Sequence, residues 1–515
     1  MNRYPLGIQT FEEIRRNNQY YVDKTYLIYN IVKGSKNNFL SRPRRFGKSL
    51  LVTTMQAYFE GKKDLFKGLA IEKLEKEWVK YPVIHIDLSS GKYYEVQRIM
   101  STLDFLLSRY ELKYDITPRD LSGFGDRFNN IIQTAAAQTG QKVVVLIDEY
   151  DAPMLDSNAK PEQQEQIRSI MRDFFSPLKA NEGLLRFVFL TGITKFSQLS
   201  IFSELNNIKN YSLDDEFGAI CGFTQEEILS TFHEGIHEMA KTNDLTTEQT
   251  VAKMKEQYDG YRFTPHCPNI YNPYSVLNAL HDKKFSNYWF ATGTPTFLLE
   301  LLIKNDIEMP QLEGIVATED QFDSPTDNIG NPIPVLYQSG YLTIKDYDEG
   351  IYTLGYPNEE VRMGLNRSML NYIAPQYGLK TTAFAAQFRA AMRKDDIDTA
   401  MKVLQSFLAA FPYDIHHNRE DYFQAILFTI FITLGFTIHA EVKTARGRID
   451  LLISTKTTIF VMELKIDQSA EKALEQIDAK DYILPYKHDG RRIFKVGINF
   501  STEKRTVDEW KYEEA

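Results

Sequence analysis

The chain is poor in the residues that mark a secreted or zinc-binding protein. Its 515 residues include two cysteines, three tryptophans and nine histidines. Cys221 and Cys267 form no CxxC pair and have no histidine at zinc-ligand spacing, which excludes a disulfide scaffold and a zinc finger. This cysteine usage is typical of a reducing compartment, so we expect a cytoplasmic protein.

Long hydrophobic runs are also missing. The most apolar stretch, residues 425–436, contains Thr429 and Thr433 and is too short to span a bilayer. The first residues contain neither an apolar signal core nor a cleavage site. We therefore predict no membrane segment and a buried helix over 425–436.

Positive charge is not in excess. The net charge is −9, which argues against a protein that coats nucleic acid through a uniformly basic surface. The 43% hydrophobic and 25% charged residues are those of a globular protein, and the length suits three or four domains. Local basic groups could still meet phosphate or simply be solvated: Arg42, Arg44 and Arg45; Arg446 and Arg448; Arg491 and Arg492.

What the sequence does contain is a phosphate-binding loop. Residues 42–49 read RPRRFGKS, against the general pattern G-x-x-x-x-G-K-[ST]. Gly47, Lys48 and Ser49 are in register, with lysine for the β/γ-phosphates and the hydroxyl for Mg²⁺. A short strand before the loop and an apolar helix over 49–59 would place the phosphates at a helix N-terminus. We predict an ATP site made by Arg42, Arg44, Arg45, Phe46, Gly47, Lys48, Ser49 and Leu50.

A second element of the same site lies about a hundred residues downstream. Residues 141–153 read QKVVVLIDEYDAP, an apolar run that suits a strand buried on both faces of a parallel sheet. Asp148 and Glu149 then fall at its carboxyl end, where such sheets bind ligands. We predict that Asp148 holds Mg²⁺ and that Glu149 polarises the attacking water. The alternative is a buried strand that ends in solvated acids.

Residues 82–88 and 185–191 predict two further strands of this sheet. Thr191 ends the second strand, where its hydroxyl could sense the γ-phosphate. A strand-terminating Thr-Gly turn explains the same residues, so both interpretations stay open. No arginine stands out as an arginine finger, because several are equally well placed.

These motifs resemble those of the bacterial AAA-ATPase-like family. That family carries a YVDKT segment, an RPRRFGKS loop, an LIDEYD strand and an LTGITKFS segment, which appear here at 21–25, 42–49, 146–151 and 190–197. The resemblance covers about residues 4–215 and implies a P-loop ATPase. Arg42 at the first-glycine position belongs to the family's own pattern. Because arginine takes positive φ less freely than glycine and adds charge, we expect nucleotide binding with slow hydrolysis.

Different chemistry is predicted near the C-terminus. Residues 446–453 and 458–466 read as two strands of a hairpin. Asp450 lies on the first strand, and Glu463 and Lys465 lie two apart on the second, which places these two on one face. The carboxylates of Asp450 and Glu463 could hold Mg²⁺ or Mn²⁺, and Lys465 could orient or activate a water.

The D…ExK pattern resembles the PD-(D/E)XK nuclease superfamily. Glu420 begins a predicted helix before the strands and would be an accessory carboxylate, with Glu441 as its rival. Gln476, in the helix that follows, matches the superfamily's glutamine and would help to position Lys465 or phosphate. The resemblance implies a metal-dependent nuclease acting on DNA rather than RNA, whereas a domain that only binds nucleic acid or a protein is the alternative.

The middle of the chain is informative about organisation. Thr224 and Glu227 predict a capping box that starts a helix, and residues 341–354 predict a hairpin. The segments 258–263 and 271–276 read as turn and packing residues, or as part of a helical lid over the nucleotide.

We therefore expect an α/β protein with a P-loop parallel sheet, a helical middle region and a C-terminal α/β nuclease-like domain. The predicted regions are 1–215, 216–310, 311–405 and 406–515. ATP, nucleic acid and further copies of the chain are the expected partners. The alternative function is a nucleotide-dependent regulatory or scaffold protein.

Overall fold

The computed structural model divides the chain into two compact units. Unit 1 comprises Met1–Thr292 and Gly314–Glu360, and unit 2 comprises Gly293–Glu313 and Val361–Ala515. The described residues are 3–89, 93, 95–117, 123–155, 161–194, 208–290, 296–305, 307, 309–324, 331–373, 378–408, 437–444, 447–455, 457–504 and 506–515. The boundaries between the units, at 292/293, 313/314 and 360/361, fall inside two of the four regions expected from the sequence, 216–310 and 311–405. No helix in these ranges is long and apolar enough to cross a membrane, and the helix expected over 425–436 lies outside them.

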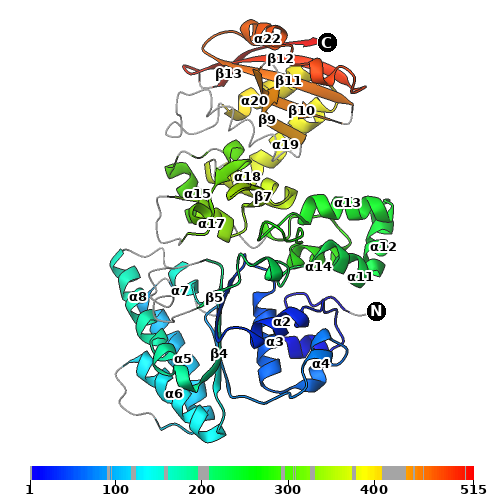
Figure 1. Cartoon of the computed structure of the whole chain (residues 1–515). Helices are drawn as coiled ribbons and strands as arrows, with labels where there is room; N and C mark the ends of the chain where they lie inside the picture. The colour runs from blue at the N-terminus through cyan, green and yellow to red at the C-terminus, as the bar shows by residue number, and fades with distance from the viewer. Residues whose placement is uncertain are drawn as a thin grey trace. The chain divides into compact units, whose positions relative to one another are not determined.

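A parallel five-stranded sheet forms the centre of unit 1 (Figure 1). Its order is β2-β3-β4-β1-β5, and every neighbouring pair is parallel. The strands are β1 (Asn37–Ser41), β2 (Val83–Asp87), β3 (Val143–Asp148), β4 (Leu185–Gly192) and β5 (Lys209–Asn210). All residues of β3 are buried, as the uninterrupted apolar run predicts.

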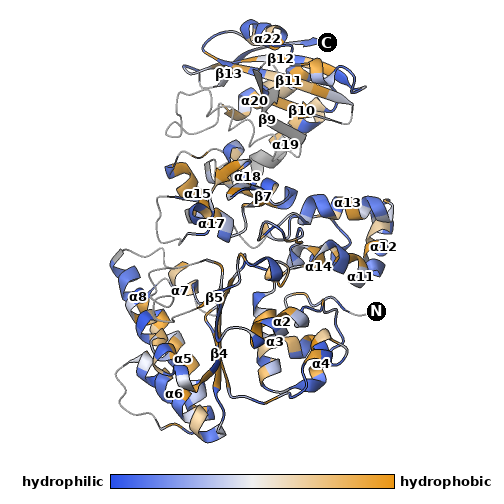
Figure 2. Ribbon diagram, viewed as in Figure 1, coloured by the Kyte–Doolittle hydropathy of each residue, from blue (hydrophilic) through white to orange (hydrophobic). Residues whose placement is uncertain are grey.

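Helices cover both faces of this sheet (Figure 1). On one face lie α5 (Val96–Lys113), α6 (Phe124–Thr139) and α8 (Pro161–Phe175). Their apolar sides join the strands in one core that includes Leu103, Phe128 and Met171, while polar residues occupy their outer sides (Figure 2). The opposite face carries α1 (Phe11–Arg16), α2 (Thr25–Lys33), α3 (Lys48–Phe59) and α4 (Ala70–Leu74).

The remainder of unit 1 contains short helices and a small sheet. The helices are α7 (Ala152–Leu155), α9 (Pro177–Ala180), α11 (Gln225–Thr231), α12 (His233–Thr242), α13 (Thr247–Tyr258), α14 (Pro273–Asp282), α16 (Glu319–Phe322) and α17 (Ile333–Gln338). Thr224 and Glu227 form the predicted capping box of α11. The predicted hairpin is also confirmed, as β7 (Thr343–Asp348) and β8 (Ile351–Gly355), with β6 (Ile315–Ala317) beside β8.

Unit 2 contains a mixed five-stranded sheet of order β13-β12-β11-β10-β9. β11 and β12 are parallel and the other pairs are antiparallel. The strands are β9 (Thr437–Thr444), β10 (Gly447–Ser454), β11 (Thr458–Ile466), β12 (Arg492–Ser501) and β13 (Thr506–Glu514). The helices are α15 (Thr296–Lys304), α18 (Glu359–Ile373, which begins in unit 1), α19 (Gly378–Met392), α20 (Ile397–Leu408) and α22 (Ala470–Ala479).

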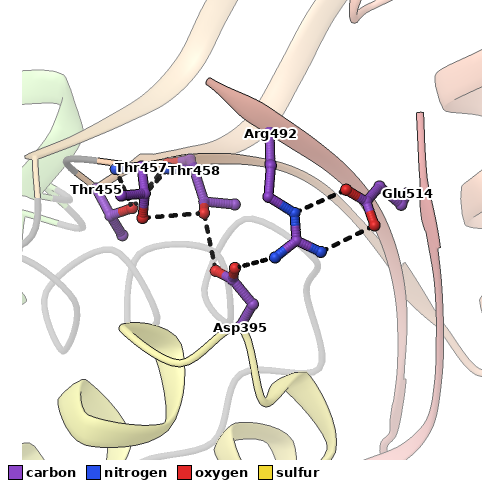
Figure 3. Close-up of polar contacts among 6 residues, drawn as sticks. All are labelled: Asp395, Thr455, Thr457, Thr458, Arg492 and Glu514. Atoms are coloured by element: carbon purple, nitrogen blue, oxygen red, sulfur yellow. Dashed lines mark hydrogen bonds and ion pairs between the residues drawn. The ribbon is translucent and has the colours of Figure 1, made fainter. Parts of the chain in front are cut away.

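Asp395, between α19 and α20, attaches these helices to the sheet of unit 2 (Figure 3). Its Oδ1 accepts a hydrogen bond from the Thr458 hydroxyl at 2.8 Å, and its Oδ2 accepts one from Arg492 Nη1 at 2.6 Å. Arg492 also binds both carboxylate oxygens of Glu514. Helices α19 and α20 therefore belong with the C-terminal sheet, and Arg492 is held by two carboxylates of its own unit.

Candidate functional sites

The P-loop joins β1 to α3 in the predicted order. Helix α3 begins at Lys48 after Gly47, whose φ is 94°, and no side chain caps its first turn. A Cβ at Gly47 would have no atom within 4 Å, so the space in front of the loop is open. Uncapped N–H groups at a helix N-terminus favour an anion, and this geometry suits phosphate.

Lys48, which follows Gly47, is buried. Its side chain is 3% exposed, and its Nζ lies 3.1 Å from Glu149 Oε1. The same ammonium donates to the Pro43 carbonyl at 3.2 Å. Glu149 directly follows β3 and has a φ of 52°, a left-handed conformation that turns the chain at the strand end. The sequence predicted that Lys48 and Glu149 belong to one site, but it did not predict the ion pair between them.

Asp148 is a buried acid of this site. It is 2% exposed, and its Oδ1 is buried without a hydrogen-bond partner among the described residues. Burial, and then the charge of Glu149, raise the pKa of Asp148 to about 7, against the opposing effects of a Ser49 hydrogen bond and the Lys48 charge. A buried, partnerless carboxylate oxygen beside a hydroxyl is a suitable ligand pair for a divalent cation.

Asp151 connects two of the sequence motifs through hydrogen bonds. Its buried Oδ2 accepts hydrogen bonds from the Ile193 N–H, the Thr194 N–H and the Thr194 hydroxyl, at 2.9, 2.7 and 2.9 Å. A Cβ at Gly192 would lie 2.3 Å from Asp151 Oδ1, so only glycine fits there. The LIDEYD and LTGIT segments are thus fixed to each other at the carboxyl ends of β3 and β4.

Arg42 does not face the phosphate space, which corrects the expectation that its charge lies beside the phosphates. The guanidinium is buried and donates to the carbonyls of Ser41, Ser212 and Phe217 at 2.9, 2.9 and 3.1 Å. It also lies 4.4 Å from the centre of the Phe263 ring. Arg42 is not among the described residues with positive φ, so arginine at this position brings no left-handed strain.

The other predicted loop residues are divided between packing and surface. Phe46 is buried against Tyr261 and Phe263, with ring centres 4.7 and 5.3 Å away. Arg44 and Arg45 are exposed and Ser49 and Leu50 are half-buried, and all four line a cavity. The Thr191 hydroxyl donates to the Leu40 carbonyl at 2.8 Å, which favours its structural interpretation over phosphate sensing.

A cavity of about 530 Å³ extends from the P-loop. Its lining includes Gly47, Lys48, Ser49 and Glu149. It also includes apolar and aromatic side chains of the N-terminal segment, of residues around α11 and of α14, namely Leu6, Ile8, Tyr20, Val22, Phe223, Phe232, Pro273 and Leu277. This volume and mixed lining suit a nucleotide, with phosphate beside the P-loop and the base against apolar side chains.

Asp450, Glu463 and Lys465 of the second predicted site lie on β10 and β11 in the sheet of unit 2. Leu451 pairs with Met462 across β10 and β11, so Asp450 and Glu463 are the next opposed positions and share one face. Asp450 Oδ2 accepts a hydrogen bond from the Leu464 N–H at 2.8 Å. Asp450 is half-buried and Glu463 is 1% exposed. Two carboxylates thus stand side by side at the end of the hairpin ladder.

Lys465 and Gln476 converge on Glu463. Lys465 Nζ lies 3.2 Å from Glu463 Oε1, and the Gln476 side-chain amide donates to the same oxygen. The period of two on β11 and the position of α22 therefore bring together three of the residues that the sequence singled out, Glu463, Lys465 and Gln476. Glu420 lies outside the described residues, as does the side chain of its rival Glu441.

Gly497 is a site residue that the sequence prediction missed. It lies beside Glu463 in the parallel register of β11 and β12. A Cβ at Gly497 would lie 2.2 Å from the Ala470 carbonyl oxygen, so glycine lets α22 approach the sheet and brings Gln476 within reach. An isolated glycine inside a strand pattern is the signal that could have identified it.

Among the described residues, no group of three or more His, Cys, Asp or Glu side chains is arranged to hold a metal ion. Mg²⁺ usually takes one or two protein carboxylates and completes its shell with water and substrate phosphates. The pairs Ser49 with Asp148, and Asp450 with Glu463, fit that kind of site.

Two family descriptions match the parts of the chain that carry these sites. "Predicted AAA-ATPase" matches residues 5–202, and "PD-(D/E)XK nuclease superfamily" matches residues 418–510. A protein of Azotobacter chroococcum mcd 1, described as an uncharacterized protein in the vnfD 5' region, is 32% identical over 519 aligned positions and covers 98% of each chain. The chain belongs to the AAA-ATPase-like family and ends in a PD-(D/E)XK nuclease-superfamily domain.

Solved structures similar to this AAA-ATPase-like protein are distant. The ORC2 protein of Aeropyrum pernix, solved as ADPNP and ADP complexes, is 10% identical over 67% of this chain and 94% of its own, with a TM-score of 0.27. The ORC1 protein of the same organism, solved in complex with DNA, is 10% identical over 67% and 91%, with a TM-score of 0.24. Scores this low support no inference about ligands of the AAA-ATPase-like protein.

Proposed function

We propose that this protein binds ATP with Mg²⁺ in the unit 1 cavity and hydrolyses it slowly. Its nucleotide state would control a Mg²⁺- or Mn²⁺-dependent nuclease in unit 2. That nuclease would act on DNA in the cytoplasm. The Lys48–Glu149 ion pair in the lining of the cavity, with the buried Asp148 beside Glu149, is the observation that carries the proposal. Bound Mg²⁺ would neutralise phosphate charge between Ser49 and Asp148.

Phosphate and Glu149 compete for the same ammonium. Lys48 is paired with Glu149. A β/γ-phosphate that takes the ammonium would release the Glu149 carboxylate, which could then accept a hydrogen bond from the attacking water. Phosphate binding would thereby free the base of catalysis.

Glu149→Gln tests this exchange. We expect ATP affinity to stay equal or to rise by roughly 2–10-fold, because a net gain of about 0.5–1.5 kcal/mol follows when the competing ion pair is removed. Hydrolysis should fall by roughly 10²–10⁴-fold, as on loss of a general base. Calorimetry and a phosphate-release assay measure the two quantities, and unchanged hydrolysis would exclude Glu149 as the base.

We expect slow turnover in the isolated parent chain, because no arginine is identified as the finger that elsewhere is worth about 10³–10⁵ in rate. A second copy of the chain or a nucleic acid would supply the missing charge.

In unit 2, Asp450 and Glu463 are proposed to hold the metal while Lys465 orients water or phosphate and Gln476 fixes the Glu463 carboxylate. A bound metal would activate water and stabilise the phosphate charge. The alternative function is a nucleotide-dependent regulator whose unit 2 binds DNA or a protein without cutting. Cleavage assays with DNA and RNA, single- and double-stranded, with and without ATP, separate the two.

A further inference from the structure

Two neighbouring P-loop residues are contacted from outside the parallel sheet. The Trp289 indole N–H donates to the Arg44 carbonyl at 3.2 Å, and the Arg45 guanidinium lies 4.5 Å from the centre of the Tyr274 ring. Arg45 has a φ of 69°. A residue with a side chain keeps this left-handed conformation only where its surroundings hold it. Trp289 and Tyr274 therefore help to maintain the shape of the loop.

One buried carboxylate holds the segments that make these contacts. Glu360 Oε1 accepts a hydrogen bond from the Trp289 main-chain N–H at 2.7 Å, and Glu360 Oε2 accepts one from the Ser275 hydroxyl at 2.7 Å. Ser275 follows Tyr274 in α14, and Glu360 itself is 1% exposed. We call this set the Glu360 clamp: Arg44, Arg45, Tyr274, Ser275, Trp289 and Glu360.

Packing alone does not require the indole hydrogen bond. The Trp289 ring is already enclosed by Phe290 and Tyr341, with ring centres 5.1 and 5.3 Å away. Phenylalanine could fill much of the same space, but it has no N–H to donate to the P-loop. Trp289 thus fills the core with its ring and fixes the position of the loop through its hydrogen bond to the Arg44 carbonyl.

The clamp also lies where the chain passes from one unit to the other. Unit 1 ends at Thr292, shortly after Trp289, and again at Glu360. Glu360 is in the first turn of α18, a continuous helix that extends into unit 2. A shift of the P-loop would therefore act on both of these connections.

We propose that Trp289 is a positioning residue of the nucleotide site, and that the Glu360 clamp transmits the state of the P-loop to the two points at which the chain leaves unit 1. This inference rests on the proposed binding of ATP at Lys48. Phosphate held by Gly47–Ser49 fixes the loop, the Arg44 carbonyl fixes Trp289, and Glu360 passes the constraint to the start of α18.

Trp289→Phe in the full-length protein tests the proposal. ATP affinity should fall roughly 3–10-fold, the usual effect of losing one hydrogen bond, while the variant stays folded with a modestly lower melting temperature, because phenylalanine fills less of this buried position. In the parent, ATP with Mg²⁺ should slow hydrogen exchange over residues 361–373, and in the variant saturating ATP should no longer do so. Trp78→Phe is the matched control, because the buried Trp78 indole N–H has no hydrogen-bond partner among the described residues.

The outcomes separate the two proposals. A parent chain that binds no ATP overturns the proposed function, and the clamp with it. A folded Trp289→Phe protein with parental ATP affinity and parental exchange protection overturns the clamp alone. Should Trp289→Phe fail to fold, Ser275→Ala removes the side-chain donor to Glu360, and loss of the exchange protection in that variant supports the clamp while its retention overturns it.

Discussion

Replacing Lys48 by methionine is expected to weaken ATP binding by roughly 100-fold, because charge-assisted hydrogen bonds contribute about 1.5–3 kcal/mol each and the ammonium would make them to phosphate. Methionine keeps most of the buried aliphatic volume of a side chain that is 3% exposed. The fold should therefore survive, which a thermal unfolding curve would verify. Isothermal calorimetry with ATP and Mg²⁺ measures the loss.

Lys62→Met is the matched control for this experiment. Lys62 follows α3, the helix that Lys48 begins, and pairs with Glu12 and Glu60 at 2.7 and 2.8 Å, with a side chain 37% exposed. It does not line the cavity, so ATP affinity should match the parent. Equal affinities of the parent and Lys48→Met would refute the P-loop assignment.

Asp450→Asn should abolish metal-dependent cleavage of DNA. Asparagine retains an oxygen for the Leu464 N–H, which Asp450 accepts at 2.8 Å, so the hairpin should stay folded. The negative charge proposed to face the metal is lost, and we expect the cleavage rate to fall by at least roughly 100-fold. This exceeds the 10–100-fold loss that is typical when a residue that only orients a metal ligand is replaced. Cleavage rates and Mn²⁺ affinity measured on the same preparation test both parts.

Two companion variants make that result interpretable. Asp478→Asn is the matched control, since Asp478 pairs with Lys495 at 2.9 Å and is 57% exposed, and it should cut like the parent. Lys465→Ala should bind metal normally and fail to cut. If the parent cleaves no DNA or RNA with either metal and Asp450→Asn leaves Mn²⁺ affinity unchanged, unit 2 is a binding module.

The features that were predicted correctly depend on local sequence patterns. The apolar run before Asp148 specifies a buried strand, and the period of two on β11 specifies that Glu463 and Lys465 share a face. Each depends on neighbours within about ten residues along the chain. The same local logic identified the capping box at Thr224 and the hairpin at β7 and β8.

Apart from Gly497, the features that were missed depend on residues far apart in the sequence. Arg42 is directed away from phosphate because carbonyls 170 and 175 residues later accept its hydrogen bonds. Trp289 reaches Arg44 across 245 residues and Glu360 across 71. No local pattern reports such pairs, because they exist only once the sheet, α14 and the start of α18 have packed together.

The path of the chain between its units has a consequence for how they can be separated. The chain passes from one unit to the other three times, at 292/293, 313/314 and 360/361. A fragment that starts at residue 361 would lack α15, which brings to unit 2 the buried side chains of Leu298, Leu299, Leu301 and Leu302. Cutting the gene once therefore cannot yield two intact halves. A recombination event that exchanged the whole of unit 2 for another would need three junctions, so the two units are expected to be inherited together.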